Sequence, residues 1–545
     1  MSPRHGDTPV KKKKKKKSAG GLIAAVLLIA VVLGAAGYLG RQALLRKRAV
    51  PPQEVLAEYL EGLGAMDSAS LAAAAGLSAP ATEDGRALLA LAADALTLSA
   101  APSEVPGDDN AALGVTVKTL DIHRLASQLN GPVNDALAAA VENARVSSEV
   151  YDEERRFRPE LVHQVFSAQL ASGAADLSAC LNETALTARL SYSKGAWTLG
   201  NAAELTAALF PAELADPDAA ARTVFDEATG ELPYVRKRYS LPEGSLRGPT
   251  PIAENFGVTR DKSVIRALLE TPEAKELIGE QSLAWNEDIE LLDDTPIYYY
   301  LDETILALTW QELTANAVGT FSEVFVADGS QIIRRIGGDR IGSDELKAIS
   351  VFAKDSNAVL AVSADFYSFV YRDYGAIVYQ RELYRFNQKD CDTCFFTADG
   401  DMLFAYAGQF ADEDDCRQFI RDNDVVFSVA FGPVIVDDSK DVMPEYYRYG
   451  EIWDTYARTA IGQLGEHHYL TMDVNKSDAH HVLVTLREAV KAMLAHGCVK
   501  AYTLDGGQTA ETVFNGQVIN PLQKPWEKPL SDAICFVSAY PGGDA

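Results

Sequence analysis

The sequence predicts an α+β protein that carries a single membrane-spanning helix near its N-terminus. Three observations lead to this prediction. A run of 23 uncharged residues lies close to the N-terminus. Apolar residues at helical spacing dominate the first half of the remaining chain, and the two-residue alternation of half-buried strands dominates the second half. At 545 residues and 47% hydrophobic content, the chain has material for roughly two to four domains, each with a buried core.

Charge is unevenly distributed along the chain. The formal net charge of −27 comes from 50 Lys and Arg against 77 Asp and Glu. Residues 1–48 hold twelve basic residues and one acidic residue, for a charge of +11, and residues 49–545 carry a charge of −38. Binding to nucleic acid requires a basic surface that displaces counterions from phosphate. The composition therefore excludes a general nucleic-acid binder and describes a small basic head on a large acidic body.

Residues 18–40 form the uncharged run and predict the membrane-spanning helix. At 1.5 Å rise per residue such a helix reaches about 35 Å, enough for a hydrocarbon core of ~30 Å. A cleaved signal peptide, with an apolar core of about 7–15 residues, is the disfavoured alternative. Seven consecutive lysines end the basic tail at residues 1–17, so the positive-inside rule places this tail in the cytoplasm. We therefore expect a single-pass cell-membrane protein with its bulk outside the cell.

Residues 50–212 are predicted to form an α+β spacer domain. Helical spacing is clearest at 52–63, 83–98 and 122–146, and strand-like alternation at 112–120, 185–192 and 196–199. In this domain two predicted helices come first, and strands separated by a long helix follow them. This order suggests an α+β arrangement. This order bears a weak resemblance to the nuclear-transport-factor-like cone folds that often precede catalytic domains in bacterial surface proteins.

The rest of the chain divides into a linker and a larger domain. Prolines punctuate residues 213–295, which are predicted to be a linker with a helical segment at 261–279. Residues 296–541 are predicted to be a β-rich α+β domain. Strand-like runs follow one another through this domain, and hairpin turns are legible at Asp399-Gly400 and Asn515-Gly516.

One segment of the larger domain indicates a functional loop. Thr485 and Glu488 have the spacing of a capping box that opens a helix, and Gly497 is placed to end it. An apolar strand at 499–504 then leads into Asp505-Gly506-Gly507-Gln508-Thr509. Asp505 therefore lies where a strand ends, on a glycine loop that lets a ligand approach the backbone. The alternative is that Asp-Gly-Gly only makes a tight turn.

The same segment resembles a known signature. Residues 503–520, T-L-D-G-G-Q-T-A-E-T-V-F-N-G-Q-V-I-N, resemble the N-L-D-G-G-G-S signature of the phosphodiester glycosidase family. That family includes the enzyme that removes N-acetylglucosamine from mannose 6-phosphodiesters, and bacterial exopolysaccharide-associated relatives. Further blocks resemble the family in order, at 361–369, 431–438, 457–463 and 529–534, so that the resemblance covers about 297–541. The sequence differs from the family pattern at Gln508, Thr509 and Ser363-Ala364-Asp365.

The resemblance implies hydrolysis of a sugar-1-phosphodiester. Such a site needs a cation for the phosphate and a carboxylate near the anomeric carbon, where positive charge develops. Arg458 is the expected phosphate clamp, because a guanidinium binds phosphate oxygens in a fork; the alternative is a structural ion pair. Asp505 is the expected carboxylate and Asp365 the second one. His468 is expected to reach the pocket as an acid or hydrogen-bond donor.

The remaining candidates would bind the substrate. Gly506 and Gly507 would offer backbone N–H groups to a phosphate or sugar oxygen. Gln508, Thr509 and Asp532 would hydrogen-bond sugar hydroxyls. Whether the anomeric configuration is retained or inverted depends on the separation of the carboxylates and stays open here.

No metal or cofactor is predicted. Five of the eight histidines fall in 467–496, but without the spacing of a metal site. Cys391 and Cys394 have C-x-x-C spacing with no second such pair, and a local disulfide or buried thiols are both open for the six cysteines. The predicted function is thus an extracellular, membrane-anchored hydrolase of sugar-1-phosphodiester links in envelope or exopolysaccharide glycans. The rival is a non-catalytic glycan-binding or envelope-assembly module on the same fold.

Overall fold

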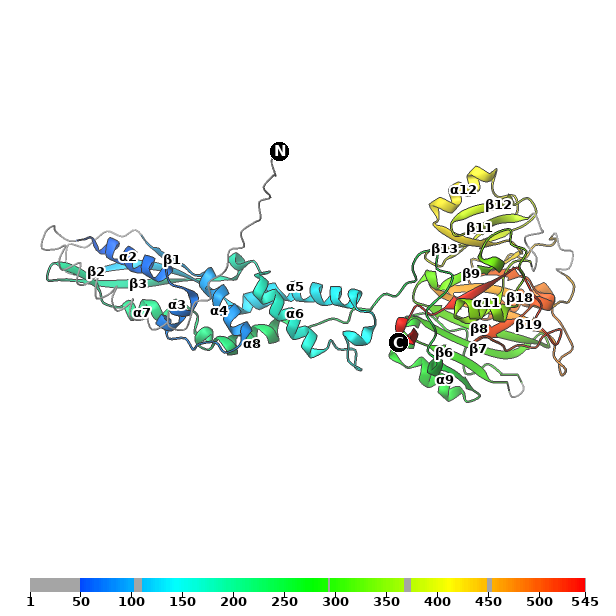
Figure 1. Ribbon diagram of the computed structural model, residues 1–545, viewed down its shortest axis with the longest axis horizontal. Helices are drawn as coiled ribbons and strands as arrows, with labels where there is room; N and C mark the ends of the chain where they lie inside the picture. Colours follow the sequence, from blue (N-terminus) through cyan, green and yellow to red (C-terminus); the bar gives the residue numbers. More distant parts are fainter. Residues whose placement is uncertain (1–49, 102–109, 293–294, 367–373, 448–452, 545) are drawn as a thin grey trace, which may run out of the picture. The chain divides into compact units, whose positions relative to one another are not determined.

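The computed structural model describes residues 50–544, apart from 102–109, 293–294, 367–373 and 448–452. They divide between Lys237 and Arg238 into two compact units, called unit 1 and unit 2 below (Figure 1). The protein is mixed α+β with several antiparallel sheets, which confirms the predicted class. The predicted basic tail at 1–17 and membrane helix at 18–40 lie outside the described residues. Within the described ranges, no helix has the length and apolar character needed to cross a bilayer.

Unit 1 contains a four-stranded antiparallel sheet of order β1-β2-β3-β4. The strands are β1 (Thr97–Ala100), β2 (Asn110–Leu120), β3 (Leu181–Ser193) and β4 (Ala196–Leu199). Helices α2 (Pro52–Gly64) and α7 (Ala202–Ala207) pack on this sheet through one apolar core. Leu56 of α2, Val115 of β2, Leu190 of β3 and Leu205 of α7 meet in that core. Burying such side chains contributes roughly 1.5–3 kcal/mol each relative to leaving them in water.

A second core of unit 1 is helical. It joins α3 (Ser68–Ala75), α4 (Glu83–Ala95), α5 (Ile122–Asn143), α6 (Pro159–Ser172) and α8 (Pro217–Ala228). In Figure 1 the helices α4, α5, α6 and α8 gather at one end of the unit and the sheet extends from the other. Helix α8 belongs to the stretch predicted as a linker. Its Val224 is buried in the helical core, and the Asp216 carboxylate caps its first turn by accepting from the N–H groups of Asp218 and Ala219.

Unit 2 is built on two antiparallel sheets. The nine-stranded sheet has the order β17-β16-β20-β18-β19-β8-β7-β6-β5. Its strands are β5 (Phe256–Thr259), β6 (Ile297–Leu301), β7 (Ile305–Thr314), β8 (Ala317–Val326), β16 (Val434–Asp437), β17 (Lys440–Asp441), β18 (Arg458–Gly465), β19 (His468–Asn475) and β20 (Lys500–Leu504). The five-stranded sheet has the order β22-β21-β10-β23-β9. Its strands are β9 (Ile332–Ile336), β10 (Ala358–Ser363), β21 (Thr512–Phe514), β22 (Gln517–Val518) and β23 (Asp532–Val537).

The two sheets face each other and are covered by helices on their outer faces. Successive side chains of β9 point to opposite faces of its sheet and so show this arrangement. Ile332 lies in the core between the two sheets, and Ile333 faces α11 (Ile349–Ser356) on the outside. Helices α10 (Pro272–Ile278) and α13 (Leu486–Ala495) cover the outer face of the nine-stranded sheet, beside α9 (Lys262–Leu269). The predicted linker is therefore shared by both units, because its C-terminal part contributes β5, α9 and α10 to unit 2.

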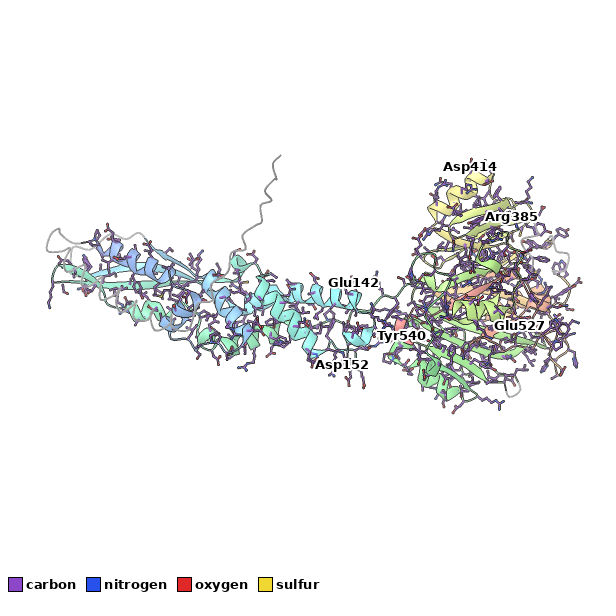
Figure 2. The ribbon with its side chains drawn as sticks, viewed as in Figure 1. Glu142, Asp152, Arg385, Asp414, Glu527 and Tyr540 are labelled. Carbon is purple, nitrogen blue, oxygen red and sulfur yellow. The ribbon has the colours of Figure 1, made fainter. Side chains whose placement is uncertain are left out.

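A smaller layer completes unit 2. It contains β11 (Gly375–Tyr379), β12 (Glu382–Asn387), β13 (Thr393–Thr397), β14 (Met402–Ala405), β15 (Val425–Val429) and α12 (Glu413–Asp422). All six cysteines are buried thiols, and Cys391 Sγ donates to Ala430 O at 3.1 Å, so the disulfide alternative does not hold in the structure. Exposed carboxylates such as Glu142 of α5 and Asp414 of α12 contribute to the acidic surfaces of the two units (Figure 2).

Candidate functional site

Arg458 and Asp505 come together at one end of the β18–β20 pair. The antiparallel register pairs Thr459 with Leu504. Arg458 precedes Thr459, and Asp505 follows Leu504, so the two residues occupy opposed positions just beyond this pair. Both line one cavity of about 150 Å³. A sheet register has therefore brought the predicted cation and the predicted carboxylate to the same pocket.

The glycine loop that follows Asp505 is held by its own hydrogen bonds. A Cβ on Gly506 would lie 2.5 Å from Ala457 O, so only glycine fits there. The Gly507 N–H donates to Ala457 O at 2.9 Å, with Gly507 in the left-handed region at φ +65°. The Thr509 hydroxyl donates to Gly506 O at 2.7 Å. The Gly507 amide and the Thr509 hydroxyl thus maintain the loop instead of pointing to a ligand, and Gln508 is exposed.

Asp505 is also fixed from the other sheet. Its N–H donates to Ala364 O at 3.0 Å, and its carbonyl accepts from Ser363 Oγ at 2.6 Å. Ser363 is the last residue of β10, so the ends of β10 and β20 meet at the site. This contact brings Asp365, two residues after β10, next to the glycine loop.

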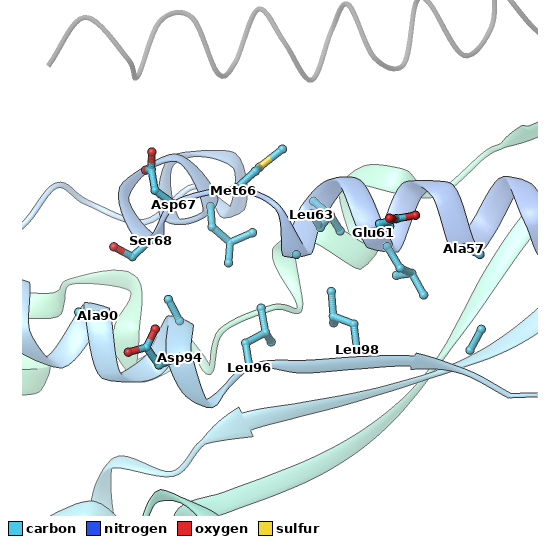
Figure 3. Close-up of a pocket in the computed structure, with 15 residues that line it drawn as sticks. Ala57, Glu61, Leu63, Met66, Asp67, Ser68, Ala90, Asp94, Leu96 and Leu98 are labelled. Carbon is cyan, nitrogen blue, oxygen red and sulfur yellow. The ribbon is translucent and has the colours of Figure 1, made fainter. Parts of the chain in front are cut away.

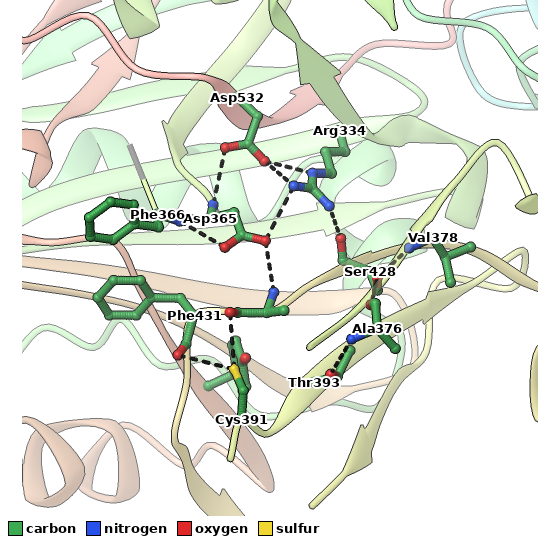
Figure 4. Close-up of polar contacts among 12 residues, drawn as sticks. Arg334, Asp365, Phe366, Ala376, Val378, Cys391, Thr393, Ser428, Phe431 and Asp532 are labelled. Atoms are coloured by element: carbon green, nitrogen blue, oxygen red, sulfur yellow. Dashed lines mark hydrogen bonds and ion pairs between the residues drawn. The ribbon is translucent and has the colours of Figure 1, made fainter. Parts of the chain in front are cut away.

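Asp365 belongs to a buried network with Arg334 and Asp532 (Figure 4). Arg334 Nη2 lies 3.3 Å from Asp365 Oδ2 and 2.6 Å from Asp532 Oδ2. The Arg334 guanidinium also donates to the Ser428 carbonyl. Since one cation faces two carboxylates away from water, the charges of this network are only partly balanced.

The network supports the cavity wall from behind. Asp365 Oδ1 accepts from the N–H of Phe366 at 2.8 Å, and its Oδ2 accepts from the N–H of Ala430 at 2.9 Å. Phe366 lines the cavity, as does Phe431, which follows Ala430. The Asp365 side chain is itself buried and is not among the residues that line the cavity. In the structure Asp365 is therefore placed to position the wall.

Asp532 does not lie where the sequence analysis expected it. Its exposed fraction is 0%, so it does not reach sugar hydroxyls, and Oδ1 accepts from the N–H of Asp365 at 3.2 Å. Burial raises the pKa of Asp532 to about 7. The negative charge of Asp365 also raises this pKa, whereas the positive charge of Arg334 lowers it. The sequence analysis missed Arg334, although two successive arginines in the apolar strand I-I-R-R-I are an unusual signal.

Arg458 is half-buried and is held by two groups. Its Nη2 donates to Asp454 O at 2.8 Å, and the guanidinium carbon lies 5.5 Å from the ring centroid of Tyr456. Tyr456 also lines the cavity. An arginine that is oriented by a carbonyl and an aromatic ring is preorganised for binding an anion.

Asp473 is a second residue that the sequence analysis did not identify. Thr459, which lines the cavity, donates its hydroxyl to Asp473 Oδ1 at 2.5 Å, and Thr512 donates to Oδ2 at 2.6 Å. Burial raises the pKa of Asp473 to about 6, and both hydroxyls oppose this effect. Asp473 therefore ties β18, which begins at Arg458, to β21, which follows the glycine loop.

The structure does not bring His468 to the cavity. Arg458 pairs with Val474 at one end of the β18–β19 ladder, and His468 pairs with Gly465 at the other. Six residues of strand separate these ends, roughly 20 Å. His468 is buried, with Nε2 2.8 Å from Glu323 Oε1 and its ring stacked on Phe325 at 3.8 Å.

A larger cavity in unit 1 has different chemistry. It measures about 610 Å³ and lies between α2, α3, α4 and β1 (Figure 3). Its lining is mainly aliphatic, with Leu63, Leu96 and Leu98 among the side chains. Its charged members are acidic, such as Glu61 and Asp94, and no Lys or Arg is among the described residues that line it. A cavity of this kind does not suit a phosphodiester.

The region around Asp505 matches a family of known proteins. Residues 356–537 match the phosphodiester glycosidase family, so unit 2 contains a domain of that family. This finding confirms the resemblance drawn from residues 503–520. The curated SPbeta prophage-derived uncharacterized protein YomE of Bacillus subtilis (strain 168) is 26% identical over 175 residues, which are 32% of this chain. The match spans only 25% of the length of that relative.

Two solved structures are similar at low identity. One is the zebrafish N-acetylglucosamine-1-phosphodiester alpha-N-acetylglucosaminidase catalytic domain, auto-inhibited by its pro-peptide. It is 15% identical with a TM-score of 0.35, and the match covers 56% of this chain and 97% of that domain. The other is a hypothetical protein from Synechocystis, 12% identical with a TM-score of 0.33, covering 45% of this chain and 64% of that one.

Proposed function

We propose that the protein is a hydrolase that cleaves sugar-1-phosphodiester links in cell-envelope or exopolysaccharide glycans. The observation that carries this proposal is the opposition of Arg458 and Asp505 at one cavity, inside a phosphodiester glycosidase family domain. The match to a family of hydrolases supports the reaction class. The acidic body of the chain repels a polyanionic substrate over the roughly 10 Å that salt leaves unscreened, so a local cation such as Arg458 is necessary where the phosphate binds.

The chemistry divides between these two residues. The leaving group is a phosphate monoester, which departs readily and needs little help from a general acid. Arg458 holds the phosphate oxygens through its guanidinium fork. Asp505 places its carboxylate at the anomeric carbon, where positive charge develops in the transition state, as nucleophile, base or electrostatic stabiliser. Asp365 does not contact the substrate and acts by positioning the backbone of Phe366 and Ala430.

The test compares the full chain with Asp505→Asn and Arg458→Lys on UDP-N-acetylglucosamine and on methyl esters of sugar 1-phosphates. Release of reducing sugar and phosphomonoester is measured. We expect Asp505→Asn to lower kcat by about 10²–10³-fold, the usual scale for losing one preorganised electrostatic group. Arg458→Lys keeps the charge and loses the fork, so it should mainly raise KM. Tyr384→Ala, an exposed side chain on β12, is the matched control and should leave both constants unchanged.

The alternative is a non-catalytic glycan-binding or envelope-assembly module. The departures from the family signature at Gln508, Thr509 and Asp365 favour it. If wild type and Asp505→Asn are equally inert over the substrate panel while both bind a glycan polymer, the hydrolase proposal is wrong and this alternative stands.

Membrane attachment is a separate part of the proposal. The 23 uncharged residues at 18–40 and the lysines before them support a single-pass anchor with a cytoplasmic N-terminus. The full chain should sediment with membranes and stay there after alkaline extraction. A chain lacking residues 1–48 should remain in the supernatant. Alkaline release of the full chain would contradict the anchor.

A further inference from the structure

Exposed aromatic side chains gather beside the cavity that Arg458 and Asp505 line. Tyr456 lines the cavity and is 39% exposed, and Trp453, three residues earlier, is 50% exposed. Tyr446 is also exposed, and the Trp453 indole N–H donates to Glu445 O at 3.0 Å, which brings Tyr446 close to Trp453. Large apolar side chains gathered on a surface mark ligand or partner sites, whereas scattered ones do not.

The rings of Trp453 and Tyr456 are held in place. The guanidinium carbon of Arg487 lies 5.3 Å from the Trp453 ring centroid, and Arg458 stands in the same relation to Tyr456. Arg487 is itself oriented by Asp441, at 3.1 Å. The Tyr456 N–H donates to Val484 O at 3.0 Å. Each ring is therefore supported by a cation and keeps a large exposed area, so a ligand would bind there with little loss of side-chain entropy.

The size of the cavity indicates that the substrate extends beyond it. About 150 Å³ is less than the ~300–1,000 Å³ typical of pockets that enclose a small-molecule ligand. Arg458 faces Tyr456, so the aromatic pair lies on the side of the cavity where the phosphate would be held. A group bonded to the far side of that phosphate would leave the cavity over Tyr456 and Trp453.

We propose that Tyr456 and Trp453 form a subsite for the sugar ring on the far side of the scissile phosphate, which makes a glycan chain the substrate. The proposal rests on the proposed function. One face of a pyranose ring presents C–H groups, which pack on an aromatic face while the hydroxyls at the ring edge stay in water. Arg458 adds positive charge where an anionic chain would pass, against the negative charge of the rest of the body, whereas the charge of Arg487 is paired with Asp441.

The test compares two esters of N-acetylglucosamine 1-phosphate, one with methanol and one with a tetrasaccharide. Trp453→Ala should raise KM for the tetrasaccharide ester about tenfold, the scale of one aromatic contact, and leave kcat unchanged. It should not change either constant for the methyl ester. Trp453→Phe should restore most of the lost affinity. Trp526→Ala, a tryptophan that is 62% exposed outside the cavity lining, is the matched control.

Equal effects of Trp453→Ala on both esters, or no effect on either, would overturn the subsite. Thermal unfolding of each variant shows whether it has folded. If wild type cleaves neither ester, the proposed function fails separately, and calorimetric titration with the tetrasaccharide ester then decides the subsite. Weaker binding by Trp453→Ala than by wild type supports it. Equal binding, or no binding by wild type, overturns it.

Discussion

Arg458 and Asp505 stand opposite each other beyond the Thr459–Leu504 pair of strands β18 and β20. Because antiparallel neighbours are held within about 5 Å, this register sets the spacing between the backbone positions of the proposed phosphate-binding cation and the proposed catalytic carboxylate. Any change that shifts the end of β20 relative to β18 should therefore affect the reaction. The following predictions test this relationship and the contacts that support it.

The first prediction separates the two glycines of the loop. Gly506→Ala places a Cβ 2.5 Å from Ala457 O and must push the loop away from Arg458, so we expect a large loss of kcat. The loss of stability should be about 1–3 kcal/mol, as for other overpacked sites. In Gly507→Ala the new Cβ meets no atom within 4 Å and only the positive φ is strained, so it should cost roughly 1–2 kcal/mol with less effect on kcat. Enzyme kinetics and urea unfolding measure both, and equal kinetic effects would contradict the close-contact argument.

The second prediction concerns Arg334. Arg334→Met removes the cation between Asp365 and Asp532 and leaves two carboxyls buried without their partner. We expect a loss of about 3–5 kcal/mol of stability, together with reduced activity because the wall residue Phe366 loses its support. Arg385→Met on β12 is the control. A change below 1 kcal/mol in urea unfolding would show that the network is not stabilising.

The third prediction is a pH dependence of stability that comes from Glu511. Burial raises the pKa of Glu511 to about 8 from an ordinary 4.5. The negative charges of Glu527 and Asp473 raise it further, whereas the hydrogen bond from the Lys528 N–H lowers it. Because the folded pKa is the higher one, the stabilisation is complete below about pH 4.5 and is lost as pH rises through 8. Glu511→Gln cannot ionise, so it should be more stable than wild type at pH 9, by a few kcal/mol, and similar to wild type at pH 4.

Calorimetry of the full chain between pH 4 and 9 measures this difference in the unfolding transition that contains unit 2. Glu142→Gln, an exposed carboxyl of unit 1, is the control and should follow the wild-type curve. Parallel curves for wild type and Glu511→Gln would contradict the prediction.

The fourth prediction addresses His468. His468→Ala removes one partner of buried Glu323, which keeps the N–H groups of Ala284 and Trp285, and should cost about 1–3 kcal/mol of stability. Since the register places His468 at the far end of β19, kcat per folded molecule should stay within about twofold of wild type, less than 0.5 kcal/mol in the barrier. If His468→Ala instead lowers kcat and removes the high-pH limb of the pH–rate profile, His468 acts as a general acid and the prediction is wrong.

Local features of the fold could be predicted from the sequence because they depend on neighbouring residues. The capping box is present, with Thr485 Oγ1 accepting from the Glu488 N–H at 3.3 Å and Glu488 Oε2 accepting from the Thr485 N–H at 2.8 Å. The strand that ends at Asp505 and the glycine loop after it were also predicted, since turn chemistry and two-residue alternation are encoded within a few positions.

Only the tertiary structure decided which of the predicted residues meet. Arg334 and Asp532 are 198 positions apart and contact each other because β9 pairs with β23. Asp365 and Asp532 lie behind the cavity and His468 far along a strand, because their positions depend on strand register and on which sheet face each side chain occupies. The sequence by itself determined the residue types that suit a sugar phosphodiester. Long-range pairing, which no local pattern encodes, selected Arg458 and Asp505 from among them.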